Sequence, residues 1–356
     1  MRLLIINPGA TSTKIAVYED ESEVYQESVL HAPDVISGYA HIIDQLPFRE
    51  ELVRAALARA GYAVASFQAV CSRGGLLRHI PSGTYAIDEA VIHDIQHPPF
   101  GEHASSLGPV IAWSIAREAG IPAYLVDPVS VDEMQPLARV SGLKGVERES
   151  FFHALNQKAV ARKASADLGK PYESLNMIVV HMGGGVSVAA HEKGRVVDVY
   201  NVRDEGSFSL DRAGSLPVNA VVNLCFSGTG KEDIKRRLSF ESGVFSYLGT
   251  RDFREVERRM LEGDAEAALI FRAMAYQHAK DIGAMAAVLR FSVDAILLTG
   301  GIAYSDRFCA EISGYVEKIA PILRYPGEEE MKSLALGALR VLRGEAPQTY
   351  PASILQ

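Results

Sequence analysis

The 356-residue sequence predicts an α/β fold built from two similar halves. One strand–turn–strand pattern occurs at residues 3–17, and a second occurs at residues 177–189. The two turns, residues 7–14 and 181–185, are rich in hydroxyl side chains or glycine, which let backbone N–H groups approach an anion closely. Strands also alternate with helices along the chain, as in folds where helices cover a sheet. These observations indicate a duplicated domain that grips one phosphate chain.

The first half continues with segments of clear periodicity. The expected elements are a helix over 48–60, a strand over 66–71, a helix over 107–119 and a buried strand over 123–126. Gly61 and Gly120 end the two helices, and Ser105 or Ser106 caps the second one.

The second half repeats this order. Its hairpin turns again at residues 192–194, a long helix covers about 265–290, and a strand follows at 295–298. His278 lies on the apolar stripe of the long helix and is interpreted as a core residue. The last helix, 331–342, is expected to pack back on the first half. The predicted domains are therefore residues 1–148 plus 331–356, and residues 149–330.

Composition narrows the classes of function. A net charge of -8 argues against a nucleic-acid or anionic membrane surface. No apolar stretch approaches the roughly 20 residues of a membrane span, and the apolar run before Asn7 is too short for a signal peptide. Cys71, Cys225 and Cys309 lie far apart, which favours neither a disulfide framework nor a zinc site. A cytoplasmic protein is expected.

Ligands bind such sheets at loops that follow the carboxyl ends of strands. Loops of this kind are expected at 7–14, 72–75, 127–132, 181–185 and 299–302. The sequence contains no GxGxxG motif. It also contains no Walker A motif, because the segment that ends at Lys231 lacks the leading glycine and no Ser or Thr follows the lysine.

Motifs in these loops resemble the acetate/butyrate kinase (acetokinase) family, within the sugar kinase, Hsp70 and actin superfamily. The motifs, in order, are Asn7-Pro8-Gly9-Ala10-Thr11-Ser12-Thr13-Lys14, Ser72-Arg73-Gly74-Gly75, Gly101-Glu102-His103-Ala104-Ser105, Val126-Asp127-Pro128, Phe152-His153-Ala154, His181-Met182-Gly183-Gly184-Gly185, Asp252-Phe253-Arg254, Thr299-Gly300-Gly301 and Pro326-Gly327-Glu328-Glu329-Glu330. The resemblance runs end to end, and the forms at 72–75 and 181–185 are most similar to butyrate kinases. Ala10 and Ser106 depart from the family's usual serine and asparagine.

The resemblance implies a duplicated ribonuclease H-like fold with a nucleotide cleft between two domains. It also implies reversible transfer of the ATP γ-phosphoryl group to a carboxylate, with ADP and an acyl phosphate as products, Mg²⁺ as cofactor, and a homodimer or larger homo-oligomer. A carboxylate is already ionised at pH 7, so the acceptor needs no general base. Two like charges at about 4 Å repel by ~4 kcal/mol at an effective dielectric of 20, so cations must offset this repulsion.

The resemblance also assigns roles to individual residues. The catalytic group is Asn7, Arg73, His153 and Arg212, with the two arginines meeting the carboxylate and the phosphoryl group. The substrate is expected to lie near Arg73, Gly74, Gly75, His103 and Phe152. ATP is expected to contact Thr11, Ser12, Lys14, His181, Gly183, Gly184, Gly185, Asp252, Phe253, Arg254, Gly300 and Gly301.

Asp127 and Glu330 are the expected Mg²⁺ ligands, with Glu329 as the alternative to Glu330. Mg²⁺ usually takes one or two carboxylates together with water and phosphate oxygens. Asp127 has a second interpretation, in which it hydrogen-bonds the turn before Pro128. The acidic residues 328–330 likewise also suit the start of a helix.

Gly74 and Gly75 stand where acetate kinases carry bulkier residues, so we expect room for a longer acyl chain. Butyrate, isobutyrate or another C4–C5 acid is then preferred, at roughly 0.8 kcal/mol per buried methylene. Acetate or propionate kinase is the nearest alternative. A sugar kinase of the same fold, with Asp127 as base, and a non-enzymatic Hsp70- or actin-like protein are the others.

Overall fold

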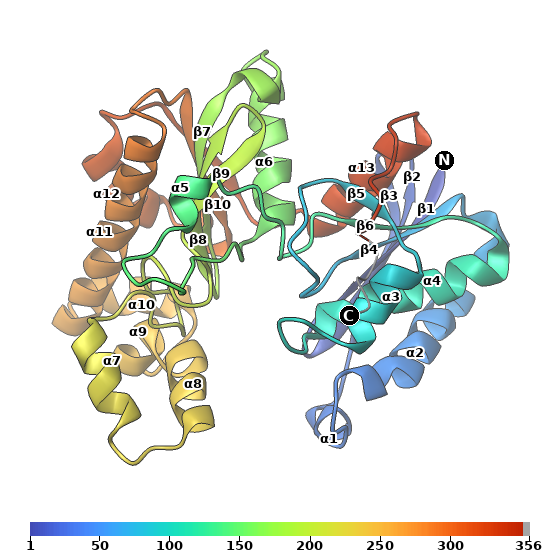
Figure 1. The fold of residues 1–356 in the computed structure, drawn as a ribbon, viewed down its shortest axis with the longest axis horizontal. Helices are drawn as coiled ribbons and strands as arrows, with labels where there is room; N and C mark the ends of the chain where they lie inside the picture. The colour runs from blue at the N-terminus through green and yellow to red at the C-terminus, as the bar shows by residue number, and fades with distance from the viewer. Residues whose placement is uncertain (352–356) are drawn as a thin grey trace. The chain divides into compact units, whose positions relative to one another are not determined.

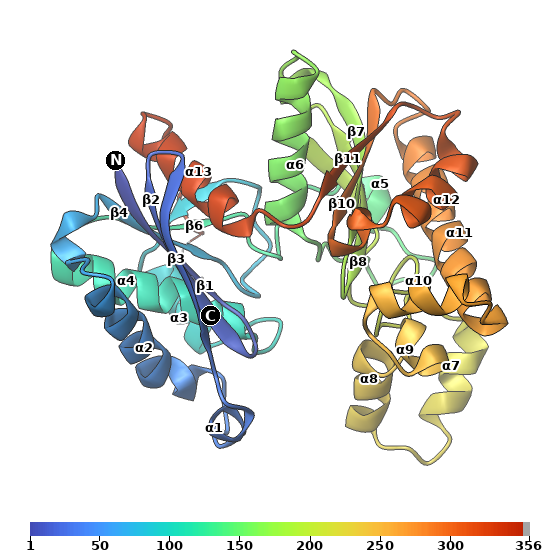
Figure 2. The same ribbon diagram turned by 180° about the vertical axis from the view of Figure 1, so that it is seen from behind.

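The computed structural model describes residues 1–351, and these form two compact units. Met1–Asp132 and the segment that begins at Glu329 make the first unit, and Glu133–Glu328 makes the second. The first unit is therefore discontinuous, and the segment 133–148 belongs with the second. Figures 1 and 2 show each unit from two sides.

A six-stranded sheet forms the centre of the first unit. Its strands, in sheet order, are β3 (Ser22–Leu30), β2 (Ser12–Glu19), β1 (Arg2–Pro8), β4 (Ala69–Arg73), β6 (Ala123–Val126) and β5 (Thr84–Ala86). The first three strands are antiparallel neighbours, β4 and β6 run parallel to β1, and β5 closes the sheet antiparallel to β6. The predicted hairpin at residues 3–17 is thus β1 and β2.

The sheet of the second unit repeats this arrangement. Its strands, in sheet order, are β9 (Arg195–Val199), β8 (Val186–Glu192), β7 (Asn176–Met182), β10 (Ala295–Gly300) and β11 (Ile322–Pro326). Three antiparallel strands are again followed by two that run parallel to the first strand in the chain. The predicted duplication is confirmed by this shared topology.

Helices cover both faces of the first sheet, which is why successive residues of β1 are buried. Leu4 and Ile6 belong to one core with the helices α2 (Leu46–Arg59) and α4 (Leu107–Ala119). The opposite face contacts α13 (Glu330–Leu342), where the Cys71 thiol donates to the carbonyl of Leu334. In Figures 1 and 2 the strands lie between α4 and α13.

The second sheet is covered in the same way. Ile178 and Val180 pack in a core with α11 (Ala265–Val288) and α12 (Asp306–Val316), whereas Met177 and Val179 face α6 (Ala154–Asp167). His278 of α11 is fully buried, which confirms its interpretation as a core residue. The remaining α-helices are α1 (Pro33–Ser37), α3 (Glu89–Gln96), α5 (Pro136–Arg139), α7 (Val218–Cys225), α8 (Lys231–Phe240), α9 (Gly243–Leu248) and α10 (Phe253–Leu261).

Two local predictions need correction. Neither serine side chain caps α4; a short 3₁₀ turn (Ala104–Ser106) precedes the helix, and His103 Nδ1 accepts from the Ser105 N–H. The strand predicted at 66–71 begins later, because Val64–Ser66 forms a 3₁₀ turn. No helix within the described residues is both long enough and apolar enough to cross a bilayer.

Candidate functional site

In the first unit, β1 and β4 bring two predicted residues to the same edge of the sheet. The strands are parallel with Ile6 opposite Ser72, so Asn7 and Arg73 follow side by side. Glu330, the first residue of α13, joins them. Its Oε2 accepts from Asn7 Nδ2 at 2.7 Å, and its Oε1 lies 2.6 Å from Arg73 Nη1. Three distant segments thus meet in one polar cluster.

Asp127, the other expected metal ligand, holds a turn. It follows β6 with a left-handed φ of 38°, a strained backbone for a non-glycine residue that often marks a functional position. Its Oδ1 accepts from Ser82 Oγ at 2.7 Å and from the Gly83 N–H at 2.8 Å. The alternative interpretation named the turn before Pro128, whereas these partners come from residues 82–83. Its role in metal binding stays a prediction.

The carboxylates available here suit Mg²⁺ better than a metal ion that protein side chains surround completely. Among the described residues, no three His, Cys, Asp or Glu side chains gather around one point. Glu330 and Asp127 are carboxylates near the ends of the strands, as an ion that keeps waters and phosphate oxygens requires. Both oxygens of Glu330 already accept hydrogen bonds, so an ion there competes with Arg73 and Asn7.

The expected space beside Gly74 and Gly75 is filled, so that argument for a longer acyl chain was wrong. A Cβ on Gly74 would lie 2.7 Å from Pro128 Cβ, and one on Gly75 would lie 2.0 Å from Ser106 Oγ. These glycines permit close packing of the strand end against its neighbours. A small pocket of about 20 Å³, room for little more than one water molecule, has Ser106 in its lining. Its lining is Ile42, Ile43, Ile95, Gln96, Pro98, Glu102, His103, Ser106 and Leu107.

Arg49 supports the first phosphate loop and was missed by the sequence analysis. The side chain is fully buried and donates to the carbonyls of Gly9 at 2.8 Å and Ala10 at 3.2 Å, and to Thr13 Oγ1. Within the part of the chain that the structure describes, no carboxylate pairs with it. The sequence does contain a sign that Arg49 is buried, because it lies on the same apolar stripe of α2 as Val53.

The loop itself is a tight turn, closed by a 2.7 Å hydrogen bond from the Gly9 N–H to the Ser12 carbonyl. Thr11 and Lys14 are exposed and Ser12 is half-buried. The positive charge of Arg49 therefore lies beneath a loop with accessible polar side chains.

In the second unit, β7 and α6 bring two predicted histidines together. The rings of His153 and His181 stack with centroids 3.7 Å apart and planes 12° apart. His153 Nδ1 lies 2.8 Å from Ser187 Oγ. His181 Nδ1 lies 2.8 Å from Asn156 Oδ1, and its Nε2 lies 3.0 Å from Glu328 Oε1. Both rings are therefore held by polar partners from other segments of the second unit.

Arg212 packs against the second glycine loop. A Cβ on Gly185 would lie 3.4 Å from Arg212 Cζ, so the guanidinium is in contact with the loop, while the same Cβ would clash with Val202 Cγ2 at 2.7 Å. Arg212 Nη1 donates to the Val202 carbonyl at 2.8 Å, and Ser209 Oγ donates to the Gly184 carbonyl. Among the described residues, no carboxylate lies within ion-pair distance of this guanidinium, although the Asp211 carboxylate interacts with it electrostatically.

Burial lowers the pKa of Arg212, the Asp211 carboxylate opposes this shift and the charge of Arg203 adds to it; a group with so high an ordinary pKa stays charged at neutral pH. Arg203 itself lies over the Phe151 ring at 4.8 Å. The second unit thus places two arginines near its glycine loop, together with the carboxylates of Asp211 and Glu328.

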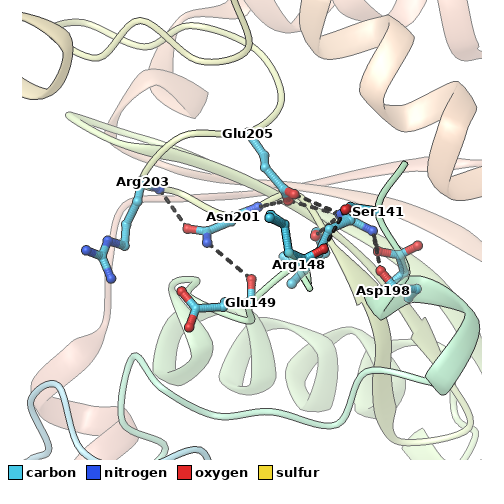
Figure 3. A network of polar contacts seen from close by, with 10 residues as sticks. Ser141, Arg148, Glu149, Asp198, Asn201, Arg203 and Glu205 are labelled. Carbon is cyan, nitrogen blue, oxygen red and sulfur yellow. Dashed lines mark hydrogen bonds and ion pairs between the residues drawn. The ribbon is translucent and has the colours of Figure 1, made fainter. Parts of the chain in front are cut away.

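An ion-pair network holds the segment that leads to His153 (Figure 3). Arg148 donates to both carboxylate oxygens of Glu205, at 2.8 and 3.0 Å, and to Asp198 Oδ1 at 2.9 Å. Asn201 Nδ2 donates to the Glu149 carbonyl. The network joins residues 148–149 to β9 and to the loop that carries Arg203.

The other residues expected at the site have structural contacts. Asp252 caps α10 by accepting from the Arg254 N–H and pairs with the Arg254 guanidinium, while Phe253 is buried. Gly300 has a φ of 87°, and a Cβ there would lie 2.3 Å from the Met182 carbonyl, so glycine lets β10 approach β7. Phe152 is fully buried, and a Cβ on Gly301 would meet open space. The proposed contacts of these residues with ligands stay predictions.

One segment of the chain contains the stacked histidines, the glycine loop and Arg212, and this segment matches a protein family. Residues 140–316 match the acetokinase family. The matched segment lies wholly within the second unit and contains His153, His181 and Arg212.

Solved structures resemble the whole chain. Acetate kinase from Porphyromonas gingivalis is 19% identical with a TM-score of 0.80, and the alignment covers 96% of this chain and 99% of that one. Acetate kinase from Entamoeba histolytica is 14% identical with a TM-score of 0.78, over 95% and 99%. A propionate kinase from Francisella tularensis subsp. tularensis SCHU S4 is 16% identical with a TM-score of 0.74, over 94% and 98%. These likenesses confirm the predicted fold class.

Proposed function

We propose that this chain is a carboxylate kinase of the acetokinase kind, which transfers the γ-phosphoryl group of ATP reversibly to a short-chain fatty acid. The observation that carries the proposal is Arg212, a guanidinium with no ion pair among the described residues, in contact with the glycine loop of the segment that matches the acetokinase family. Such a group is suited to charge that develops on a transferring phosphoryl group.

Each unit supplies part of the chemistry. Arg73 binds the substrate carboxylate, the loops at 7–14 and 181–185 bind the phosphates, and Arg212 and His153 stabilise the transferring group. A carboxylate oxygen attacks the γ-phosphorus in line while the bond to the ADP oxygen breaks. Phosphoryl transfer depends on positioning and charge stabilisation, so no side chain needs to act as a base.

Glu330 and Asp127 are the proposed ligands of Mg²⁺. When bound, the ion neutralises charge on the phosphate oxygens. Mg²⁺ at Glu330 would replace one of the two hydrogen bonds that this carboxylate accepts from Asn7 and Arg73. A homo-oligomer and a cytoplasmic location are further parts of the proposal that rest on the resemblance alone.

Butyrate or a branched C4–C5 acid is the proposed acceptor. This choice rests on the resemblance to butyrate kinases at 72–75 and 181–185. Acetate or propionate remains the nearest alternative. An apolar pocket separates acids that differ by one methylene by only about 1–3 kcal/mol, so the enzyme should accept several acids.

A hydroxyl acceptor is disfavoured by the contacts of Asp127. A sugar kinase of this fold needs an aspartate as base, whereas Asp127 Oδ1 already accepts two hydrogen bonds. These bonds from Ser82 and the Gly83 N–H occupy the oxygen that would have to take a proton from a hydroxyl acceptor.

The test is acyl phosphate formation from ATP, trapped by hydroxylamine as the hydroxamate, with acetate, propionate, butyrate, isovalerate and glucose as acceptors. We expect hydroxamate with the fatty acids, the highest kcat/KM with a C4–C5 acid, and no stimulation of ADP release by glucose. A preference for acetate would overturn only the acyl-chain assignment. ADP release that no carboxylic acid stimulates would overturn the proposed reaction.

A further inference from the structure

The contacts around His153 determine which of its ring nitrogens carries the proton. Gln157 Nε2 lies 3.0 Å from the backbone carbonyl of Ser187. A carbonyl oxygen only accepts, so the Gln157 amide must present its NH₂ group there. Its Oε1 then faces His191 Nε2 at 3.0 Å, and this nitrogen must be the donor.

The contacts of His191 agree with this orientation of the Gln157 amide. His191 is fully buried, and burial holds its pKa well below the ordinary value, so the ring is neutral. A neutral ring protonated at Nε2 accepts at Nδ1, and Nδ1 lies 2.7 Å from the Tyr172 hydroxyl, which donates to it.

The hydrogen bonds of the Ser187 hydroxyl can then be counted completely. Its oxygen accepts the second hydrogen of Gln157 Nε2 at 2.8 Å and the His153 backbone N–H at 3.4 Å. A hydroxyl has two lone pairs and one hydrogen, so the hydrogen remains for His153 Nδ1 at 2.8 Å. Nδ1 is therefore an acceptor, and in the neutral ring the proton sits on Nε2.

We propose that Gln157 and Ser187 are positioning residues that hold neutral His153 as its Nε2–H tautomer, so that Nε2 donates to an oxygen of the transferring phosphoryl group. The opposite tautomer would direct a lone pair at the phosphoryl oxygens. Stacking on His181 limits rotation of the ring and so keeps the direction of Nε2. The donor role rests on the proposed function, whereas the tautomer follows from the contacts alone.

Nuclear magnetic resonance of the full chain with ¹⁵N-labelled histidine tests the tautomer directly. Long-range ¹H–¹⁵N couplings distinguish a protonated from an unprotonated ring nitrogen, and loss of one set of signals in His153→Gln assigns His153 among the 10 histidines. We expect a protonated Nε2 and an unprotonated Nδ1 in the parent. A protonated Nδ1 with an unprotonated Nε2 would overturn the proposal.

Ser187→Ala removes the donor to Nδ1. We expect the His153 signals to shift toward a mixture of tautomers, and kcat to fall about tenfold while KM for ATP and for the carboxylate changes little, because one hydrogen bond in the transition state is lost. Ser187→Thr keeps the hydroxyl and should restore both the tautomer and kcat. The matched control is Ser165→Ala in α6, the helix that carries Gln157; the Ser165 hydroxyl donates to the Arg162 carbonyl, and its loss should change neither the tautomer nor kcat.

Different results would overturn the positioning role of Ser187 and the donor role of His153. Unchanged His153 signals in Ser187→Ala would overturn the positioning role of Ser187. A shifted tautomer with unchanged kcat would overturn the donor role of His153. Failure of the proposed reaction itself would appear as no acyl phosphate from the parent, and the parent spectrum would still report the tautomer.

Discussion

Arg73 and Glu330 form a 2.6 Å ion pair between the end of β4 and the start of α13, although 257 residues separate them in the sequence. The same carboxylate accepts from Asn7. An arginine expected to bind substrate and a carboxylate expected to bind metal are thus partners. Each holds the other in place, and ligands must compete for both.

The first prediction concerns Arg73. Arg73→Ala should lower kcat/KM about 10²–10³-fold, because a charged donor aimed at the reacting group is lost. The free energy of unfolding should change by less than about 1 kcal/mol, since the pair is partly exposed. The control is Arg343→Ala, which breaks a half-exposed pair with Glu21 and should leave the rate intact. Steady-state kinetics and urea unfolding measure both effects, and parental activity in Arg73→Ala would contradict the proposed role.

The second prediction concerns Arg49 beneath the first phosphate loop. Arg49→Met should weaken ATP binding about tenfold, or roughly 1.4 kcal/mol, because a buried charge near the phosphates is lost and the loop loses its support. The thermal shift produced by saturating MgATP should shrink accordingly. Arg54→Met on the same helix, where Glu50 and Glu118 already pair with the arginine, should keep the full shift. Equal ATP affinity in the Arg49 and Arg54 variants would refute this role.

The third prediction concerns the Arg148 network of Figure 3. Glu205→Ala should lower the free energy of unfolding by about 2–4 kcal/mol, because Arg148 is left without its bidentate partner. Arg148→Met combined with Glu205→Met should cost less than the sum of the single changes, since the two act as a pair. Glu262→Ala, which breaks an exposed pair with Arg258, should cost little. Additive effects in the urea unfolding series would rule out the coupling.

The fourth prediction concerns pH. Asp281 accepts from the Ser207 N–H at 2.7 Å, and burial raises its pKa from 3.8 to about 6. A folded-state pKa above the unfolded value means that this contribution to stability is complete below about pH 3.8 and is lost as pH rises through 6. Asp281→Asn should therefore gain stability relative to the parent as pH rises from 4 to 7, by about 2–3 kcal/mol at most.

Asp264 provides the control of opposite sign. The Ala267 N–H and Arg259 lower its pKa, so its contribution is present above pH 3.8 and is lost at lower pH. Asp264→Asn should be less stable than the parent at pH 7, and the difference should vanish in acid. Thermal unfolding between pH 3.5 and 7.5 measures both variants. A stability difference for Asp281→Asn that does not vary with pH would show that the carboxylate stays ionised throughout.

Local pattern was enough to predict much of the fold. The helix at 107–119 and the strand at 123–126 match α4 and β6, because apolar periodicity and the turn at Gly120, with a φ of 67°, are encoded within a few residues. The two hairpins and the last helix followed from the same kind of signal. Strands β3 and β11 were missed, since their alternating or partial exposure leaves no buried run to detect.

The sequence alone determined the fold class, the duplicated hairpins and the candidate residues near the strand ends, because these depend on short-range periodicity and on motifs that resemble a family. The tertiary structure decided which side chains meet. Glu330 pairs with Arg73, Ser106 fills the space over Gly75, Arg49 supports the first loop, and Ser187 hydrogen-bonds His153. Those contacts join segments that are distant in the sequence, and packing against a sheet, rather than any local pattern, brings them within hydrogen-bonding distance.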